Sequence, residues 1–232
     1  RPITRPHTRM GGARANDEGA AGEPATDAAA RLLAAEAGRR RSEVQYEHTA
    51  GVIDLTWGHP DPSELASEAI AAASADVLGR LGWQSLAYGA PAGAGSVREA
   101  IAAHLTRVDS PTDADQIVIT AGSSGALDLV LSLTAKPGDV VFVERPTYFL
   151  ALRIFADHGV TAVGLGGDAD GPSTDALCDA VRRAQSRGAR TLLYLVPTFA
   201  NPTGRCLFSG RAAELLEVAA STNTLVIEDD VY

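Results

Sequence analysis

Short apolar runs and longer stretches of mixed polarity alternate along the second half of the chain. The apolar runs predict strands at residues 116–120, 139–144, 160–165, 191–196 and 224–228. The intervening stretches, with one more just before them, predict helices over about residues 96–107, 124–135, 148–158, 174–187 and 211–222. Strands that are apolar on both faces and separated by helices pair mostly in parallel. The pattern therefore predicts an α/β fold with three layers, a mostly parallel sheet with helices on both faces.

The first residues of the chain lack this alternation. Residues 1–47 are rich in Ala, Gly, Arg and Glu and hold few aromatic or β-branched side chains. Such a segment buries too little apolar surface to offset the entropy of ordering it. We expect a disordered or linker-like tail, with at most one helix over about 27–38 and a solvated basic patch at 39–41.

Two further regions follow the tail. Residues 48–95 are expected to form an N-terminal arm and a first helix, and residues 96–232 hold the alternating pattern. Within the arm, residues 52–57 predict an extended segment followed by the turn "GHPDP". Ser63 is the expected N-cap of a helix that ends near Leu81.

Composition narrows the class of protein. With 232 residues and 45% hydrophobic content, the chain can bury a core of its own. A net charge of −9 disfavours nucleic acid as a partner. Cys178 and Cys206 have no metal-ligand spacing, so we expect no metal site and a reducing, cytoplasmic setting. No apolar run reaches the roughly 20 residues that span a bilayer. Because residue 1 is arginine, both ends are expected to be cuts.

Polar residues follow the predicted strands, where ligands gather in parallel α/β sheets. The segment "ITAGSSGALDLV" leads from a strand into a helix through Gly122, Ser123 and Ser124. Free N–H groups and the positive end of the helix dipole favour an anion at such a place. The sequence fits a simple small-residue turn with Ser123 as the helix cap equally well.

Four more residues stand at the ends of later strands. Tyr148 fits either the core or a flat platform for an aromatic ligand, and Asn201 either a turn or an amide that binds a ligand oxygen. Asp229 fits a helix cap, a surface acid or the partner of a protonated ring nitrogen, and Tyr232 can donate to an oxygen of the same ring. Taken together with the anion cradle, they would hold a phosphorylated aromatic ring that bears a basic nitrogen and a hydroxyl. Pyridoxal 5'-phosphate (PLP) is such a molecule.

The order of these motifs resembles a known family. Residues 53–232 resemble the class I/II aminotransferases of PLP fold type I, in the branch with 2-aminoadipate and aromatic aminotransferases. The resemblance lies in "DLTWGHPDP", "YGAPAGAGSVREAIAAHL", "ITAGSSGALDLV", "VERPTY", "YLVPTFANPTG" and "VIEDDVY". It implies a PLP-dependent transferase that moves an amino group from an amino acid to a 2-oxo acid, with residues 96–232 as an incomplete PLP-binding large domain.

The resemblance also implies roles for residues in the phosphate and ring contacts. Gly122, Ser123 and Ser124 match the phosphate-binding loop, and Tyr148 matches the aromatic residue that stacks on the pyridine ring. Such a cofactor acts as an electron sink when the substrate loses its Cα proton.

The remaining implied roles concern the ring substituents, the substrate and a second subunit. Asn201 and Tyr232 match the donors to the ring 3'-oxygen, and Asp229 matches the partner of the pyridine nitrogen. Tyr88 resembles the tyrosine that reaches the phosphate of a neighbouring subunit in a homodimer. Gly58 matches the segment near the substrate carboxylate.

The family also needs a lysine for the internal Schiff base, and this chain has no match for it. The only lysine is Lys136, at the far end of the helix that begins near Ser124, about 18 Å from the cradle at 1.5 Å per residue. The resemblance therefore implies an N-terminal, C-terminally truncated part that would not complete transamination alone. Two alternatives stay open: the aminotransferase-like domain of a winged-helix transcriptional regulator, and a non-catalytic remnant. The substrate amino acid is not identified by the sequence.

Overall fold

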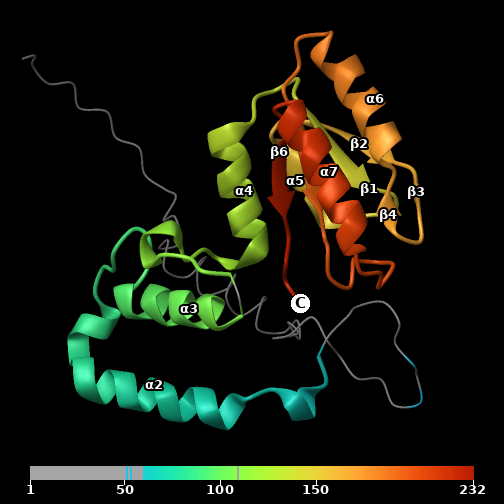
Figure 1. The fold of residues 1–232 in the computed structure, drawn as a ribbon. Coiled ribbons are helices and arrows are strands. Elements are labelled where there is room, and N and C mark those ends of the chain that lie inside the picture. Colours follow the sequence, from blue (N-terminus) through green and yellow to red (C-terminus); the bar gives the residue numbers. More distant parts are fainter. Residues whose placement is uncertain (1–50, 52, 54–59, 109) are drawn as a thin grey trace, which may run out of the picture. The chain divides into compact units, whose positions relative to one another are not determined.

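The computed structural model describes residues 51, 53, 60–108 and 110–232 (Figure 1). The predicted tail, most of the predicted extended segment and Gly58 lie outside these residues. The chain divides into two compact units, Arg1–Ser85 and Leu86–Tyr232. Each unit is described by itself. The expected boundary between the arm and the large domain at residues 95 and 96 stays a prediction.

In the first unit, a short 3-10 turn, η1 (Pro62–Glu64), precedes the helix α2 (Ser67–Leu81). The prediction that Ser63 caps this helix is wrong. Asp61 caps η1 instead: its carboxylate accepts hydrogen bonds from the backbone N–H and the hydroxyl of Ser63, at 2.8 and 2.7 Å. The proline after Asp61 suits the first position of a helical turn, which leaves the cap position to the aspartate. The predicted end of α2 is confirmed, and a second 3-10 turn, η2 (Gly82–Leu86), follows it.

The second unit is built on four parallel strands. They are β1 (Val140–Glu144), β2 (Thr161–Leu165), β5 (Thr191–Leu195) and β6 (Leu225–Glu228). Their order in the sheet is β2-β1-β5-β6, so β2 and β6 lie at its edges within the described part of the chain (Figure 1). All three neighbouring pairs run parallel, and four of the five predicted strands are thereby confirmed.

The fifth predicted strand, residues 116–120, is not formed. A 3-10 turn, η3 (Ala114–Gln116), covers its start, and the residues after it join no sheet. Among the described residues, its one backbone bond to a distant segment runs from the Ile119 N–H to the Ala92 carbonyl, at 2.9 Å. An apolar run becomes a strand only where a neighbouring strand exchanges backbone hydrogen bonds with it along its length. The sequence of the run does not specify whether such a neighbour exists.

The sequence pattern also missed a small hairpin. Two antiparallel strands of two residues each, β3 (Gly167–Asp168) and β4 (Gly171–Pro172), follow β2. Segments this short contain no period of polar and apolar positions to detect.

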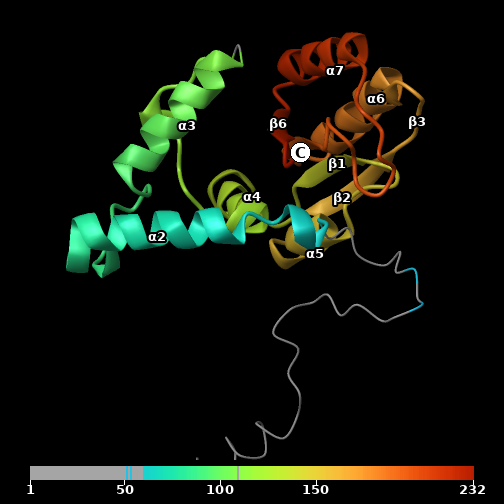
Figure 2. The same ribbon diagram turned by 90° about the horizontal axis from the view of Figure 1, so that it is seen from below.

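The predicted helices are confirmed with small shifts at their ends. They are α3 (Gly95–Arg107), α4 (Gly122–Thr134), α5 (Phe149–Asp157), α6 (Thr174–Gln185) and α7 (Ser209–Ser221). α6 and α7 lie together on one side of the sheet, with α5 on the other (Figure 2). None of the described helices is both long and apolar enough to cross a membrane.

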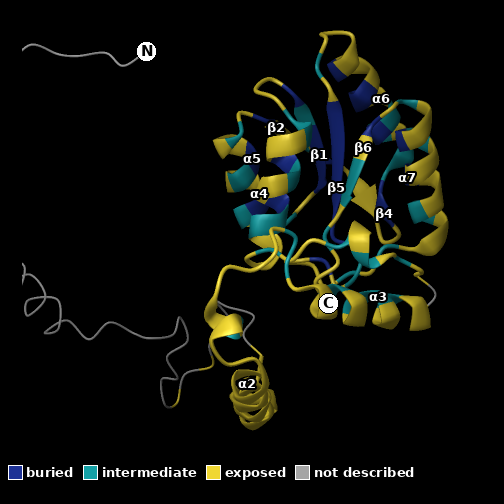
Figure 3. Ribbon diagram, turned by 90° about the vertical axis from the view of Figure 1, so that its left-hand side faces the viewer, coloured by how far each residue is buried: buried dark blue, intermediate teal, exposed yellow. Residues whose placement is uncertain are grey.

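Side chains at successive strand positions pack into two separate hydrophobic cores, one on each face of the sheet. On β5, Leu192 and Tyr194 pack with α4 and α5, whereas Leu193 and Leu195 pack with α6 and α7. This alternation follows from the pleat, which turns successive side chains to opposite faces. The two central strands, β1 and β5, are accordingly the most buried part of the unit, whereas the edge strands β2 and β6 are mostly exposed or half-buried (Figure 3). The predicted three-layer α/β fold is confirmed.

Two neighbouring leucines of α7 test this core. Leu215 is 0% exposed and Leu216 is 53% exposed. Leu215→Ala should lower the free energy of unfolding by about 2–5 kcal/mol, because it leaves a cavity in the layer between α7 and the sheet. Leu216→Ala should change it by about 0.5 kcal/mol or less. Urea denaturation followed by circular dichroism measures both, and equal losses would contradict the assignment of the buried face.

Candidate functional site

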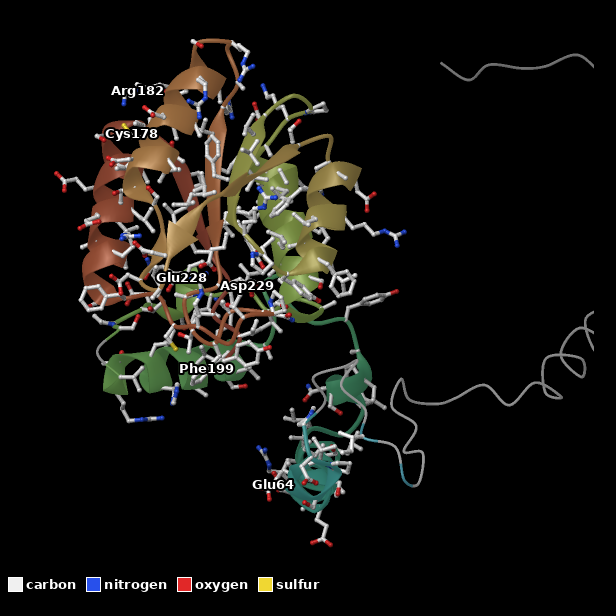
Figure 4. The ribbon with its side chains drawn as sticks, turned by 90° about the vertical axis from the view of Figure 1, so that its right-hand side faces the viewer. Glu64, Cys178, Arg182, Phe199, Glu228 and Asp229 are labelled. Atoms are coloured by element: carbon white, nitrogen blue, oxygen red, sulfur yellow. The ribbon has the colours of Figure 1, made fainter. Side chains whose placement is uncertain are left out.

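The carboxyl ends of the parallel strands open onto one cavity of about 170 Å3. Its lining consists of Ser123, Tyr148, Val196, Asn201, Asp229, Val231 and Tyr232. Phe199 belongs to the loop that carries Asn201. Asp229 lies at the same end of the sheet as Phe199 (Figure 4). Five predicted site residues, which are separated by up to about a hundred positions in sequence, therefore surround a single space.

The start of α4 forms one wall of this cavity. Gly122 has a φ of +75°, a backbone conformation that residues with a side chain rarely adopt. Ala121 occupies the N-cap position and makes no side-chain hydrogen bond to the helix. The alternative in which Ser123 caps the helix is therefore wrong. Ser123 and Ser124 are exposed in the first turn. Backbone N–H groups in a first turn without a side-chain cap are suited to an anion.

Tyr148 agrees in part with both interpretations of the sequence, a core residue and a platform for an aromatic ligand. It is half-buried and occupies the N-cap position of α5, where it packs against the first core but also lines the cavity. Its ring meets the ring of Phe149 edge-on, with centroids 5.8 Å apart. An aromatic surface thus reaches the cavity from the end of β1.

Asn201 is exposed in a loop that closes on itself. The backbone N–H of Ala200 donates to the Arg205 carbonyl at 2.8 Å, and that of Leu207 to the Pro197 carbonyl at 2.7 Å. These bonds make the asparagine part of a turn, as one interpretation predicted, and at the same time bring it to the cavity.

The hairpin of β3 and β4 holds this loop from outside. The N–H of Phe208 donates to the Asp170 carbonyl at 3.1 Å, and a guanidinium nitrogen of Arg211 donates to the Pro172 carbonyl at 2.8 Å. A second arginine, Arg205, bonds the backbone carbonyl of Asp168. The position of the loop therefore rests on contacts that the motif "NPTG" does not reveal.

Tyr232 lies on the exposed side of the cavity. Its side chain is 64% exposed, and its ring meets that of Phe199 edge-on, with centroids 6.4 Å apart. Phe199 has a φ of +47°, which is uncommon for a residue with a side chain. The loop backbone is thus bent where this ring reaches Tyr232.

Asp229 is held from two sides by β5. Its backbone N–H donates to the Leu195 carbonyl at 2.9 Å, which continues the pairing of β6 beyond its last residue. Its carboxylate accepts a hydrogen bond from the hydroxyl of Tyr194 at 2.5 Å. Burial, and then the bond to Asp229, raise the pKa of Tyr194 far above its ordinary value. The phenol therefore remains a donor at any physiological pH.

Sequence reasoning missed both Tyr194 and a buried acid, Glu144. Tyr194 lies in the apolar run "TLLYL", where a tyrosine fits a core position; its place directly before the last residue of β5 was the available signal. Glu144 ends β1 and is only 8% exposed. Burial raises the pKa of Glu144, an effect that Arg205 partly opposes.

Tyr88 and Lys136 are not among the residues that line the cavity. Tyr88 is fully exposed, and its predicted contact with a second subunit stays a prediction. Gly58 lies outside the described residues. Lys136 is exposed just beyond the end of α4 opposite to Ser123, in a turn where its N–H donates to the Asp139 carboxylate at 2.8 Å. The Lys136 side chain is therefore exposed to solvent at the far end of α4, as expected.

Comparisons with known proteins agree with this arrangement. The family model described as aminotransferase class I and II matches residues 50–232. Aromatic-amino-acid aminotransferase 1 of Thermococcus litoralis is 32% identical over 87% of this chain and 49% of its own length. An uncharacterized HTH-type transcriptional regulator of Bacillus subtilis, YisV, is 31% identical over 81% of this chain and 38% of its own length.

A solved structure gives the same result. LysN, the α-aminoadipate aminotransferase of Thermus thermophilus complexed with N-(5'-phosphopyridoxyl)-L-leucine, superposes with a TM-score of 0.68 at 30% identity, covering 76% of this chain and 43% of LysN. The chain belongs to the aminotransferase class I and II family. It spans about half the length of the curated relatives it matches.

Pyridoxal 5'-phosphate is the cofactor of this family, as the resemblance implied. The residues around the cavity fit such a group. The uncapped start of α4 suits a phosphate, and the carboxylate of Asp229 suits a protonated pyridine nitrogen. Asn201 and Tyr232 supply donors for a ring oxygen. No part of this donor set conflicts with a phosphorylated pyridine.

The buried acid beside the site gives a pH-dependent prediction. Because burial raises the pKa of Glu144 above 4.5, its contribution to stability is complete below that pH and is lost as pH rises through the folded-state pKa. Glu144→Gln, which stays neutral, should become more stable than the unchanged chain as pH rises from about 4 to about 8. Unfolding free energies measured by urea titration across that range test this. Glu217→Gln on the exposed side of α7 is the control, and a difference for Glu144→Gln that does not vary with pH would contradict the expectation.

Proposed function

We propose that this chain forms the N-terminal part of the cofactor-binding domain of a PLP-dependent aminotransferase. The reaction would move an amino group from an amino acid to a 2-oxo acid, in the cytoplasm. The observation that carries the proposal is the single cavity that joins the start of α4 with Tyr148, Asn201, Asp229 and Tyr232. The family match and the likeness to LysN support it.

Different residues of the chain would bind the phosphate and the pyridine ring of the cofactor. The N–H groups at Ser123 and Ser124 would bind the phosphate, because they carry the positive end of the α4 dipole. Gly122 would shape this phosphate-binding loop through its positive φ, since its own N–H donates to the Thr120 carbonyl at 2.9 Å. Tyr148 would hold the face of the pyridine ring. When bound, PLP supplies an electron sink for removal of the substrate Cα proton.

Asp229 has the central chemical role in this proposal. A carboxylate close to a cation favours the charged form of that cation, so Asp229 would keep a proton on the ring nitrogen. Asn201 and Tyr232 would donate to the 3'-oxygen of the ring and so fix its rotation about the axis through the nitrogen. In a homodimer of the full-length protein, Tyr88 would reach the phosphate of the second subunit, and Gly58 would lie near the substrate carboxylate.

A second function is favoured by one specific observation. The regulator YisV is 31% identical over 81% of this chain, so the same domain could serve to sense a cofactor or an amino acid in a DNA-binding protein. The two candidates differ outside the matched region. The genomic reading frame separates them: an upstream winged-helix segment supports the regulator, and its absence together with a lysine downstream of "VIEDDVY" supports the enzyme.

Neighbouring aspartates offer a matched test of the cofactor site. Pyridoxamine 5'-phosphate is the suitable probe, because it lacks the aldehyde that would react with Lys136 or the amino terminus. Asp229→Ala should weaken its binding by about tenfold or more, the size expected when a charged hydrogen bond is lost. Asp230→Ala, at an exposed position one residue later, should leave binding unchanged. Equilibrium dialysis gives both dissociation constants, and equal effects of the two substitutions would count against the proposed site.

A further inference from the structure

The contact between Tyr194 and Asp229 joins the core to the cavity. Tyr194 pairs with Ile227 across β5 and β6, and side chains alternate along a strand, so Ile227 and Asp229 share the sheet face of Tyr194. Tyr194 is 0% exposed, and its ring packs edge-on against Phe155, with centroids 5.4 Å apart. The phenol ring therefore has little freedom to move.

The rigidity of this ring is passed on to the carboxylate. The only polar atom of the Tyr194 side chain is its hydroxyl, and it donates to Oδ2 of Asp229 at 2.5 Å. The backbone of Asp229 is fixed by the next residue of β5, through the bond from its N–H to the Leu195 carbonyl at 2.9 Å. Two consecutive residues of β5 thus set both the main chain and the side chain of Asp229. The hydrogen bonds of the described residues leave Oδ1 of Asp229 without a partner, and Asp229 lines the cavity.

A carboxylate at a strand end without such a donor would rotate among several staggered positions. Each rotation would turn its oxygens relative to a ring held by the start of α4 and by Tyr148. A fixed rotamer avoids that loss of order when a ligand binds, which is the general advantage of preorganisation. The hydroxyl of Tyr194 is therefore in a position to contribute to binding without touching the ligand.

We propose that Tyr194 is a positioning residue, whose hydroxyl fixes the Asp229 carboxylate so that it faces the protonated ring nitrogen of a pyridine ligand. The proposal rests on the proposed function, because it deepens the role of Asp229 in the same cavity. It goes beyond the proposed function by assigning a task to a buried core residue that is not part of the cavity lining.

The test removes only the hydroxyl. Tyr194→Phe keeps the ring that packs on Phe155, and Thr191→Val is the matched control, because it removes a buried hydroxyl bond from the other end of the same strand. Tyr194→Phe should weaken binding of pyridoxamine 5'-phosphate by about threefold to tenfold, whereas Thr191→Val should leave it unchanged. Binding is measured by equilibrium dialysis with the full chain.

A second ligand separates positioning from a merely structural role. The analogue of pyridoxamine 5'-phosphate in which the ring nitrogen is replaced by carbon cannot pair with Asp229. Tyr194→Phe should bind this analogue as well as the unchanged chain does. An equal loss for both ligands would mean that the hydroxyl supports only the shape of the cavity, and the proposal would be overturned.

Spectroscopy gives a readout that does not depend on affinity. In 15N-labelled pyridoxamine 5'-phosphate, the ring nitrogen shift reports its protonation, and Tyr194→Phe should move the bound signal toward that of the neutral ring. If Tyr194→Phe does not fold, 3-fluorotyrosine at position 194 changes the strength of the donor at almost constant shape and should shift the same signal. An unchanged 15N shift with either replacement overturns the proposal.

The outcomes also separate this proposal from the one on which it rests. If Asp229→Ala leaves binding of pyridoxamine 5'-phosphate unchanged, the proposed function itself fails. If Asp229→Ala weakens binding while Tyr194→Phe alters neither binding nor the 15N shift, only the role of Tyr194 fails. In the double variant, loss of the hydroxyl should add nothing to the loss caused by Asp229→Ala, because the two groups act as one unit.

Discussion

Parallel pairing of β1, β5 and β6 is the constraint on which the cavity depends. Strands that run in the same direction bring their carboxyl ends to one edge of a sheet, and the segments after them are forced to meet there. The register pairs Val143 with Tyr194 and Tyr194 with Ile227, so the three strands end nearly level. Tyr148, Asn201 and Asp229 become neighbours for this reason, although each lies in its own loop.

The same sheet makes the core and the site parts of one structure. β5 is buried along its whole length, and each of its faces belongs to a different hydrophobic layer. Tyr194 brings a polar group into one of these layers, where an unsatisfied hydroxyl would be costly. Its bond to Asp229 satisfies the hydroxyl and orders the carboxylate at once. The requirement of the core and the requirement of the site are met by a single interaction.

How much of this could be predicted from the sequence depended on whether the signal was local. Four strands and five helices of the second unit follow from apolar runs and their spacing, and the gathering of site residues follows from parallel topology. The failures have the opposite character. Residues 116–120 lacked a pairing partner. Ser63 lies inside the 3-10 turn that Asp61 caps, and α2 begins only after it, with Ala66 at its N-cap. The partner of Tyr194 lies 35 positions away, so no local pattern could identify it.

The place of β6 in the sheet has a consequence for how the cavity is maintained. This strand is four residues long, only partly buried, and pairs on one side within the described part of the chain. Short edge strands open locally at a lower free energy than central ones, in fluctuations that hydrogen exchange detects. Opening of β6 would carry Asp229 away from Tyr194 while the rest of the sheet stays folded. Within the described part of the chain, the pairing of β6 with β5 therefore determines how firmly the Asp229 carboxylate is held beside Tyr194.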